Sequence, residues 1–351
     1  MRILNNARID SYSSFRLPAT ARRLIQINSR EGVVQALSQF AGQPFYLLGA
    51  GSNSVFLQDM DISLLQFHGR GFAARDLGDG RVRVQVGAGE NWHRVVVRCC
   101  HAAWHGLENL ALIPGDCGAA PVQNIGAYGV ELAEHLEWVD AVDLQRRCFV
   151  RLTNVDCQFA YRDSLFKRHL GRYLITDLAF ILQRRFQPRL DYADLARRFD
   201  AISTTLSAKQ LLQAVIDIRR SKLPDPGETP NCGSFFKNPV VPVRMLQALR
   251  NDHALVPNWP LDTNQVKLSA AWLIDQCGLR GYRVGGAAVS EQHALVLVNL
   301  GQATGTQLAE LIDHVRDQVN DRFGIWLEPE VRLLGSAGVL DPALPVRRQL
   351  N

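Results

Sequence analysis

The sequence has no pair of cysteines at metal-binding spacing and no long apolar run. No two of its seven cysteines form a C-x-x-C motif, which excludes the common zinc and thioredoxin-like patterns and predicts reduced thiols. No run of 18 apolar residues occurs, so no transmembrane helix is predicted. The first residues also lack the apolar stretch of a signal peptide. We therefore expect a cytosolic protein that has no membrane partner and no metal site.

The chain also lacks a strong excess of one charge. Its net charge is +5 over 351 residues, and the lysines and arginines are spread along it. This favours an anionic small molecule over nucleic acid as the partner. With 47% hydrophobic and 21% charged residues, the composition is that of a globular protein with two or three domains.

Apolar periodicity predicts an α+β fold. A helix is expected over 31–40, a short strand over 45–48, a strand over 82–86 and a helix from Trp92 to Ala103. Further along, we expect a helix over 267–277, a strand over 294–298, a helix from Leu308 to Val319 closed by Gly324, and a strand over 326–334. Period two along the last strand places Glu328, Glu330 and Arg332 on one face.

A domain boundary is expected near residue 224. Ser207 and Gln210 form a capping box, and apolar residues continue this helix to Ile218. The helix must stop before Pro224, because the stretch 223–230 holds three prolines and a glycine.

Two glycine-rich loops are candidates for phosphate or cofactor binding. The first, Gly49-Ala-Gly-Ser-Asn53, follows a strand, but the third glycine of a dinucleotide fingerprint is missing, and a tight structural turn is the alternative. The second runs from Ile113 to Gly129. It combines Gly115, Gly118, Gly126 and Gly129 with the amides Gln123 and Asn124. Exposed loops seldom carry so many apolar residues, so a buried ligand cradle is favoured.

Three further segments carry charge or hydrogen-bonding groups. Tyr161-Arg-Asp-Ser164 places a cation beside an acid, and a simple surface ion pair is the alternative to a functional role. Arg219, Arg220 and Lys222 lie at a helix end, where the alternative is that their charges only complement the helix dipole. The segment Asn231-Cys-Gly-Ser-Phe-Phe-Lys-Asn-Pro239 groups a glycine, a hydroxyl, two aromatics and a cation, as a sugar-nucleotide site would.

Taken together, these segments resemble the UDP-N-acetylenolpyruvoylglucosamine reductase family. The match rests on seven motifs in the family's order, from Gly49-Ala-Gly-Ser-Asn53 to Leu327-Glu-Pro-Glu-Val-Arg332. Five further motifs lie between these two. They are Ile113-Pro-Gly115 through Gln123-Asn-Ile-Gly-Ala-Tyr-Gly-Val-Glu131, Tyr161-Arg-Asp-Ser-Leu-Phe-Lys167, Gly233-Ser-Phe-Phe-Lys-Asn-Pro239, Trp272-Leu-Ile-Asp-Gln-Cys-Gly278 and Gly285-Gly-Ala-Ala-Val289. Asp116-Cys117 and Ser290-Glu-Gln-His293 depart from the family pattern.

The resemblance implies two FAD-binding subdomains of the vanillyl-alcohol-oxidase type and a substrate-binding domain. We expect the first subdomain over 1–70, completed by 334–351, the second over 71–223 and the substrate domain over 224–333. The implied reaction is the NADPH-dependent reduction of UDP-N-acetylglucosamine enolpyruvate to UDP-N-acetylmuramate, through non-covalently bound FAD, in peptidoglycan precursor synthesis.

The resemblance also assigns residues. Arg162 and Glu330 would stabilise the developing enolate, and Ser234 would donate the proton. Substrate would be held by Tyr192, on a loop that folds over the nucleotide, and by Lys222, Lys237 and Asn238. FAD contacts would come from the two glycine loops and the helix end: Gly49, Gly51, Ser52, Asn53, Gly115, Gln123, Asn124, Gly126, Gly129 and Arg219.

Two alternatives remain open at this stage. A different FAD-dependent oxidoreductase on the same fold would share the glycine loops without needing Ser234 and Glu330. A non-catalytic nucleotide-sugar binding protein would need the cations but no flavin.

Overall fold

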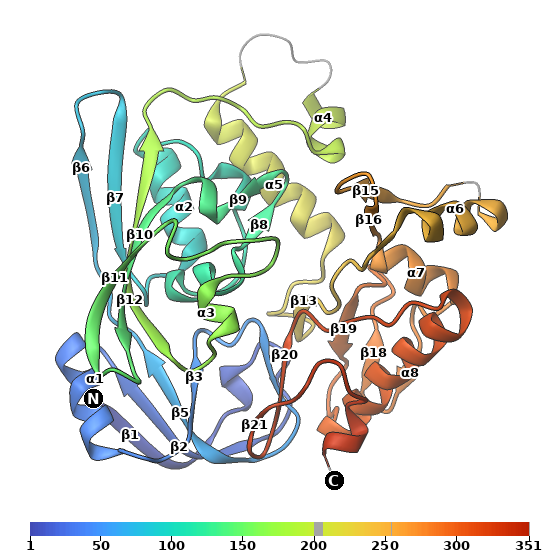
Figure 1. Cartoon of the computed structure of the whole chain (residues 1–351), viewed down its shortest axis with the longest axis horizontal. Coiled ribbons are helices and arrows are strands. Elements are labelled where there is room, and N and C mark those ends of the chain that lie inside the picture. The colour runs from blue at the N-terminus through green and yellow to red at the C-terminus, as the bar shows by residue number, and fades with distance from the viewer. Residues whose placement is uncertain (200–205, 254, 351) are drawn as a thin grey trace. The chain divides into compact units, whose positions relative to one another are not determined.

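The computed structural model describes residues 1–199, 206–253 and 255–350, and the chain divides into two compact units. Unit 1 consists of Met1–Asn5, Arg23–Ala50 and Ser63–Ser221. Unit 2 consists of Asn6–Arg22, Gly51–Ile62 and Lys222–Asn351. Figure 1 labels the elements along the chain. The division into three domains that the resemblance implied stays a prediction.

The largest sheet of unit 1 has five strands in the order β11-β10-β12-β7-β6, with all neighbours antiparallel. Its strands are β6 (Phe72–Asp76), β7 (Arg81–Gly87), β10 (Leu136–Asp143), β11 (Cys148–Thr153) and β12 (Tyr173–Gln183). Val82, Val84 and Val86 of β7 are fully buried, while the residues between them are polar. The alternation therefore predicts correctly which face of β7 joins the core.

Helices α2 (Trp92–His101) and α5 (Ala208–Lys222) share a core with this sheet. Trp92 lies edge-on to Phe180 of β12, with the ring centroids 5.8 Å apart. The Asn91 side chain caps α2 by accepting from the backbone N–H of Arg94. Shorter elements of unit 1 are η2 (Glu108–Leu110), η3 (Cys117–Gln123), β8 (Gly126–Ala127), β9 (Val130–Glu131), η4 (Leu132–Glu134), α3 (Leu165–Arg168) and α4 (Ala193–Phe199).

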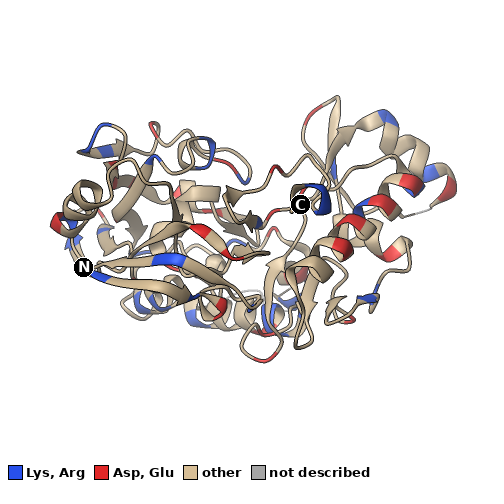
Figure 2. Cartoon of the chain, turned by 90° about the horizontal axis from the view of Figure 1, so that it is seen from below, with Lys and Arg blue, Asp and Glu red and all other residues tan. Residues whose placement is uncertain are grey.

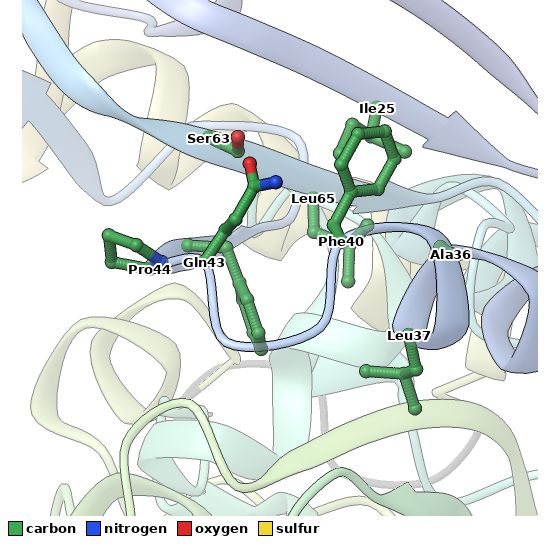
Figure 3. A pocket seen from close by; sticks show the side chains of 9 residues that line it. Ile25, Ala36, Leu37, Phe40, Gln43, Pro44, Ser63 and Leu65 are labelled. Atoms are coloured by element: carbon green, nitrogen blue, oxygen red, sulfur yellow. The ribbon is translucent and has the colours of Figure 1, made fainter.

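A second sheet has the strand order β1-β2-β5-β3 and is accompanied by α1 (Arg30–Gln39). Its strands are β1 (Arg2–Arg8), β2 (Thr20–Ile27), β3 (Phe45–Leu48) and β5 (Met60–Phe67). A small void of about 20 Å³ lies here, lined by Leu37, Phe40, Leu65 and their neighbours (Figure 3). It has room for about one water molecule, so it is not a ligand site.

The described residues of unit 2 form three small sheets and three α-helices. The sheets are β13-β19-β18-β17, β14-β16-β15 and β21-β20-β4. Their strands are β4 (Ser54–Phe56), β13 (Asn231–Ser234), β14 (Val240–Pro242), β15 (Asn258–Pro260), β16 (Gln265–Leu268), β17 (Arg283–Val284), β18 (Ala287–Val289), β19 (Val296–Asn299), β20 (Arg332–Gly335) and β21 (Gly338–Val339). The helices are α6 (Val243–Asp252), α7 (Ala270–Gln276) and α8 (Gly305–Phe323). Val55 of β4 and Phe15 belong to the same core as α7 and α8, so early segments of the chain complete this unit.

Side chains of α8 hold the C-terminal tail, residues 342–347, by hydrogen bonds. Arg316 is completely buried and donates to the carbonyl oxygens of Leu344 at 2.9 Å and Pro342 at 2.7 Å. Asp313 accepts from the backbone N–H groups of Val346 at 2.7 Å and Arg347 at 3.0 Å. The buried charges are thus compensated by the tail itself.

Several local predictions are confirmed. The helix over 31–40 is α1, the strand over 45–48 is β3, and α8 ends at Gly324 with φ +65°. The capping box forms as expected, because Gln210 N donates to Ser207 Oγ at 3.3 Å and Ser207 N donates to Gln210 Oε1 at 2.9 Å.

Other local predictions are wrong in their bounds. The strand over 326–334 begins only at Arg332, because Pro329 pairs with Phe236 in an isolated bridge and bends at Glu330 and Val331 separate this bridge from β20, which pairs with β4. Its burial pattern is nevertheless as expected: Leu327 and Val331 are buried and Glu328 is exposed. The helix over 267–277 starts at Ala270 behind the N-cap Ser269, and the strand over 294–298 is β19 (Val296–Asn299).

Candidate active site

The first glycine loop is a closely packed turn at Gly51. Gly51 has φ +73°, and a Cβ atom added to it would lie 1.8 Å from the carbonyl oxygen of Tyr12. The backbone N–H of Ser14 donates to the Gly51 carbonyl at 3.1 Å. Backbone packing within unit 2 therefore requires glycine here, which is the structural alternative for this loop. The FAD contacts of Gly51 and Ser52 stay predictions.

Gly49 joins the start of this loop to the second glycine loop within unit 1. A Cβ atom at Gly49 would lie 3.2 Å from the Cβ atom of Ala119. The Gly49 carbonyl accepts from the buried Gln66 side chain at 2.8 Å, and His68 Nε2 lies 2.9 Å from Gln66 Oε1. Sequence reasoning missed Gln66, although a glutamine that ends an apolar strand could have been noticed.

The second glycine loop contains the buried 3-10 helix η3 between two backbone positions that favour glycine. Gly115 has φ +120° and Gly129 has φ +82°. At Gly118, a Cβ atom would lie 2.7 Å from the Cβ atom of Ala88, and the Gly118 N–H donates to the Ala88 carbonyl at 2.8 Å. The loop is thus held against the end of β7, and its role as a ligand cradle stays a prediction.

Asn124 shapes this loop from inside. It has φ +44° and is almost completely buried. Its Nδ2 donates to Glu131 Oε2 at 2.7 Å and to the Ala160 carbonyl at 3.2 Å, and its Oδ1 accepts from Ala133 N at 3.0 Å. The side-chain amide is therefore engaged with the protein. Its predicted FAD contact stays a prediction.

The side chains of Arg162, Arg219 and Tyr128 form a positively charged cluster in unit 1. Arg162 has φ +53°, and its Nη2 donates to the Gly126 carbonyl at 2.9 Å. Arg219 Nε is buried and makes no hydrogen bond to the residues that the structure describes. Burial and the charge of Arg162 lower the pKa of Arg219, and burial raises the pKa of Tyr128 to about 12 against the attraction of Arg219. Such a group suits a ligand that is anionic or rich in acceptors.

The ring of Tyr192 lies against Tyr128 in the same unit. Their centroids are 5.1 Å apart with an interplanar angle of 77°, which is an edge-to-face contact. Tyr192 remains 37% exposed, so its ring is available to a ligand.

Ser234 and Glu330 are neighbours in unit 2. The backbone N–H of Glu330 donates to the Phe235 carbonyl at 2.8 Å, and Phe236 pairs with Pro329 in an isolated bridge. Both phenylalanines are completely buried and anchor this backbone. The segments that carry these two residues, nearly a hundred positions apart in the sequence, are thus held side by side.

Asn53 supports Glu330 from the other side. Its Nδ2 donates to the Glu330 carbonyl at 3.2 Å, and its own carbonyl accepts from Arg332 N at 3.0 Å. Asn53 therefore helps to fix the backbone that carries Glu330, a role that its place in a glycine loop did not suggest.

The remaining predicted substrate residues also lie in unit 2. Lys237 forms an ion pair with Glu328, and Asn238 Oδ1 accepts from Ala270 N at 2.9 Å, at the start of α7. Lys222 is exposed at the end of α5. Burial and the charges of Arg280 and Lys222 lower the pKa of His293. A surrounding of this sign suits a diphosphate.

The predicted residues thus fall into two sets, one in each unit. Unit 1 holds Gly49, Gly115, Gln123, Asn124, Gly126, Gly129, Arg162, Tyr192 and Arg219, whereas unit 2 holds Gly51, Ser52, Asn53, Lys222, Ser234, Lys237, Asn238 and Glu330. Figure 2 shows basic and acidic residues interspersed along the chain, as the small net charge suggests. In the described part of the chain, no group of His, Cys, Asp and Glu could hold a metal ion, and no helix is long and apolar enough to cross a membrane.

Comparisons with known proteins find matches in segments of both units. A family profile described as the C-terminal domain of UDP-N-acetylenolpyruvoylglucosamine reductase matches residues 225–334, and one described as an FAD binding domain matches residues 21–146. A reductase of that name from Idiomarina loihiensis is 43% identical over 337 residues, which cover 94% of this chain and 97% of the relative. The reductase of the same name from Escherichia coli (strain K12) is 42% identical over 337 residues, covering 95% and 97%.

A solved structure is similar over the same length. The crystal structure of UDP-N-acetylenolpyruvylglucosamine reductase from Thermus caldophilus has a TM-score of 0.67 at 24% identity, covering 95% of this chain and 99% of that chain. At this identity the likeness supports the fold alone.

Proposed function

Because the chain belongs to the UDP-N-acetylenolpyruvoylglucosamine reductase family, we propose that Ser234, Glu330 and Arg162 perform the chemistry of that reductase here. The reaction is the NADPH-dependent reduction of UDP-N-acetylglucosamine enolpyruvate to UDP-N-acetylmuramate through FAD, in peptidoglycan precursor synthesis. Neither a different flavin oxidoreductase nor a non-catalytic binding protein accounts for relatives of one name along nearly the whole chain. The observation that carries the residue assignment is the pairing of the Ser234 and Glu330 segments.

Residues of unit 1 fit the cofactor. A buried guanidinium nitrogen that has no protein partner is costly unless a ligand supplies an acceptor, and Arg219 Nε is in that position. We assign Arg219 to the flavin ring, and the residues of the two glycine loops named above to the rest of FAD. When bound there without a covalent link, FAD would supply the hydride chemistry that connects NADPH with the enolpyruvyl double bond.

Ser234 is assigned as the proton donor. Its Oγ–H would protonate the carbanion that the addition of hydride leaves on the substrate. A serine hydroxyl is a weak acid, so this step requires a strongly basic acceptor and a fixed position. The buried Phe235 and Phe236 that follow Ser234, and the hydrogen bond that the backbone N–H of Glu330 donates to the Phe235 carbonyl, support such a fixed position.

Arg162 and Glu330 are assigned to the charge that develops on the substrate. A planar guanidinium can hold a carboxylate-type dianion through two parallel hydrogen bonds. The bond from Arg162 Nη2 to the Gly126 carbonyl fixes the orientation of that guanidinium. Glu330 would act on the same charge through its carboxyl group, which must carry a proton in order to donate a hydrogen bond to it.

The UDP-sugar is assigned to Lys222, Lys237, Asn238 and Tyr192. The cationic surrounding of Lys222 and the exposed face of the Tyr192 ring support this assignment. We propose a cytosolic location, and the expectation that neither nucleic acid nor membrane is a partner stays a prediction.

Stopped-flow absorbance of Ser234→Ala tests the assignment. Bleaching of the flavin on mixing with NADPH should proceed at the wild-type rate, because the serine takes no part in that half-reaction. The return of flavin colour on mixing reduced enzyme with enolpyruvyl substrate should slow by about a hundredfold to ten-thousandfold, the usual cost of losing a general acid.

Ser336→Ala is the matched control, since Ser336 lies in the same unit between β20 and β21. It should leave both half-reactions unchanged. If Ser234→Ala slows bleaching and leaves the return of colour unaffected, the serine is not the proton donor.

A further inference from the structure

The side chain of Asn109 ties together two backbone positions that lie far apart in the sequence. Asn109 belongs to η2 in unit 1 and is almost completely buried. Its Nδ2 donates to the Tyr128 carbonyl at 2.9 Å and to the Arg189 carbonyl at 3.0 Å. Both hydrogens of one amide are thus used to hold two segments at a set distance from each other.

The first of these positions is the turn of the β8–β9 hairpin. Tyr128 has φ +50° and Gly129 has φ +82°, so both central residues are left-handed, as in the tight turns that join hairpin strands. This turn ends the second glycine loop. The conformation leaves little freedom to the Tyr128 carbonyl, which makes it a firm anchor.

The second position lies in the segment that leads from β12 to Tyr192. Residues 187–189 are exposed, and Leu190 is partly buried against the unit 1 core. The Arg189 side chain lies 3.5 Å from the Gly129 carbonyl and 3.6 Å from Glu134, but it is about half exposed. Exposed contacts of this kind contribute little. The bond from the buried Asn109 is therefore the stronger attachment of this segment.

We propose that Asn109 is a positioning residue for the nucleotide. It holds the segment that carries Tyr192 against the turn at the end of the second glycine loop, so that Tyr192 is presented to the UDP-sugar. The edge-to-face contact of Tyr128 and Tyr192 is the visible result of this docking. The proposal rests on the proposed function of Tyr192. Its consequence is that substrate affinity depends on a side chain that touches neither substrate nor flavin.

Steady-state kinetics of the holoenzyme with Asn109→Ala test the proposal. The KM for the UDP-sugar should rise about three- to tenfold, the effect expected from losing a buried hydrogen-bonding side chain, while kcat and the rate of flavin bleaching by NADPH stay within about twofold. Amides of residues 189–196 should exchange with deuterium faster by a similar factor. Asn109→Leu nearly keeps the side-chain volume, removes both donors and adds no charge, and it carries the test if the alanine variant does not fold.

Asn154 provides the matched control, because its Nδ2 also joins two carbonyls of unit 1, those of Ala133 at 2.7 Å and Leu136 at 2.8 Å. Asn154→Ala should leave the KM unchanged. The positioning role is overturned if Asn109→Ala also leaves the KM unchanged. It is overturned as well if the variant changes the KM but also lowers kcat and the rate of flavin bleaching.

Tyr192→Ala, measured in parallel, separates the two proposals. If Tyr192→Ala raises the KM and the double variant with Asn109→Ala is no worse, both proposals are supported. If Tyr192→Ala raises the KM but Asn109→Ala does not, only the docking role fails. An unchanged KM in Tyr192→Ala overturns the nucleotide contact itself, and the docking role with it.

Discussion

Asp116 at the start of η3 should make the stability of the protein depend on pH. Its carboxyl group is half-buried, and burial raises its pKa to about 6 from an ordinary value of 3.8, with Arg70 opposing the rise. Below about pH 4 the group is protonated in both folded and unfolded chains, so burial costs little. As the pH rises to about 6, the unfolded chain loses its proton more readily, and the folded state is destabilised. Above that pH the full cost is present.

Asp116→Asn should remove this cost, because asparagine has nearly the same shape and carries no charge. A tenfold difference in proton affinity corresponds to about 1.4 kcal/mol, so the full pKa difference would give about 3 kcal/mol. Since the side chain keeps part of its solvation, we expect about 1–2 kcal/mol of added stability at pH 8, with little gain near pH 4.

Urea unfolding of wild type and variant at a series of pH values measures this difference. Asp156→Asn is the control of opposite sign, because hydrogen bonds from Thr153 hold the pKa of Asp156 below its ordinary value. That variant should lose stability at neutral pH. A gain for Asp116→Asn that is the same at pH 4 and pH 8, or a loss at pH 8, would refute the reasoning.

Two further predictions follow from single positions. Lys222→Ala should raise the KM for the UDP-sugar more than it lowers kcat, because a point charge near a diphosphate acts in ground and transition states alike; a loss of kcat at an unchanged KM would contradict this. Gly51→Ala should lower the free energy of unfolding by about 2 kcal/mol or more in urea titrations, because the added Cβ meets the Tyr12 carbonyl. Gly42→Ala, at φ +74° with no atom within 4 Å of its Cβ, isolates the backbone cost and should lose only about 1 kcal/mol.

The fold class and the family could be predicted because they depend on local patterns and ordered motifs. The α+β class, the FAD-binding region and the C-terminal reductase domain are confirmed. Alternation along β7 and the spacing of α1 are properties of neighbouring residues. The expected strand over 326–334 is interrupted by a bend at Glu330 and Val331, because the residues on either side of it pair with different segments, which an alternation of apolar residues does not show.

The supports of the site could not be predicted, because they join distant segments. Nothing near Asn109 in the sequence indicates that its partners are the carbonyls of Tyr128 and Arg189. The FAD contact that the resemblance implies for Asn53 stays a prediction, but the hydrogen bond from its amide to the Glu330 carbonyl could not be foreseen from a glycine loop. Such contacts exist only after the chain has folded.

The parallel pairing of β4 with β20 sets an order of events during protein synthesis. Ser54 pairs with Arg332 and Phe56 with Leu334, so β4 lacks this partner until residues 332–334 have been synthesised. At ordinary rates of translation this delay is on the order of tens of seconds. During that time Val55, Phe56 and Phe15, all buried in the finished unit, face water or a chaperone. These apolar residues of unit 2 are therefore open to aggregation until β20 has been made.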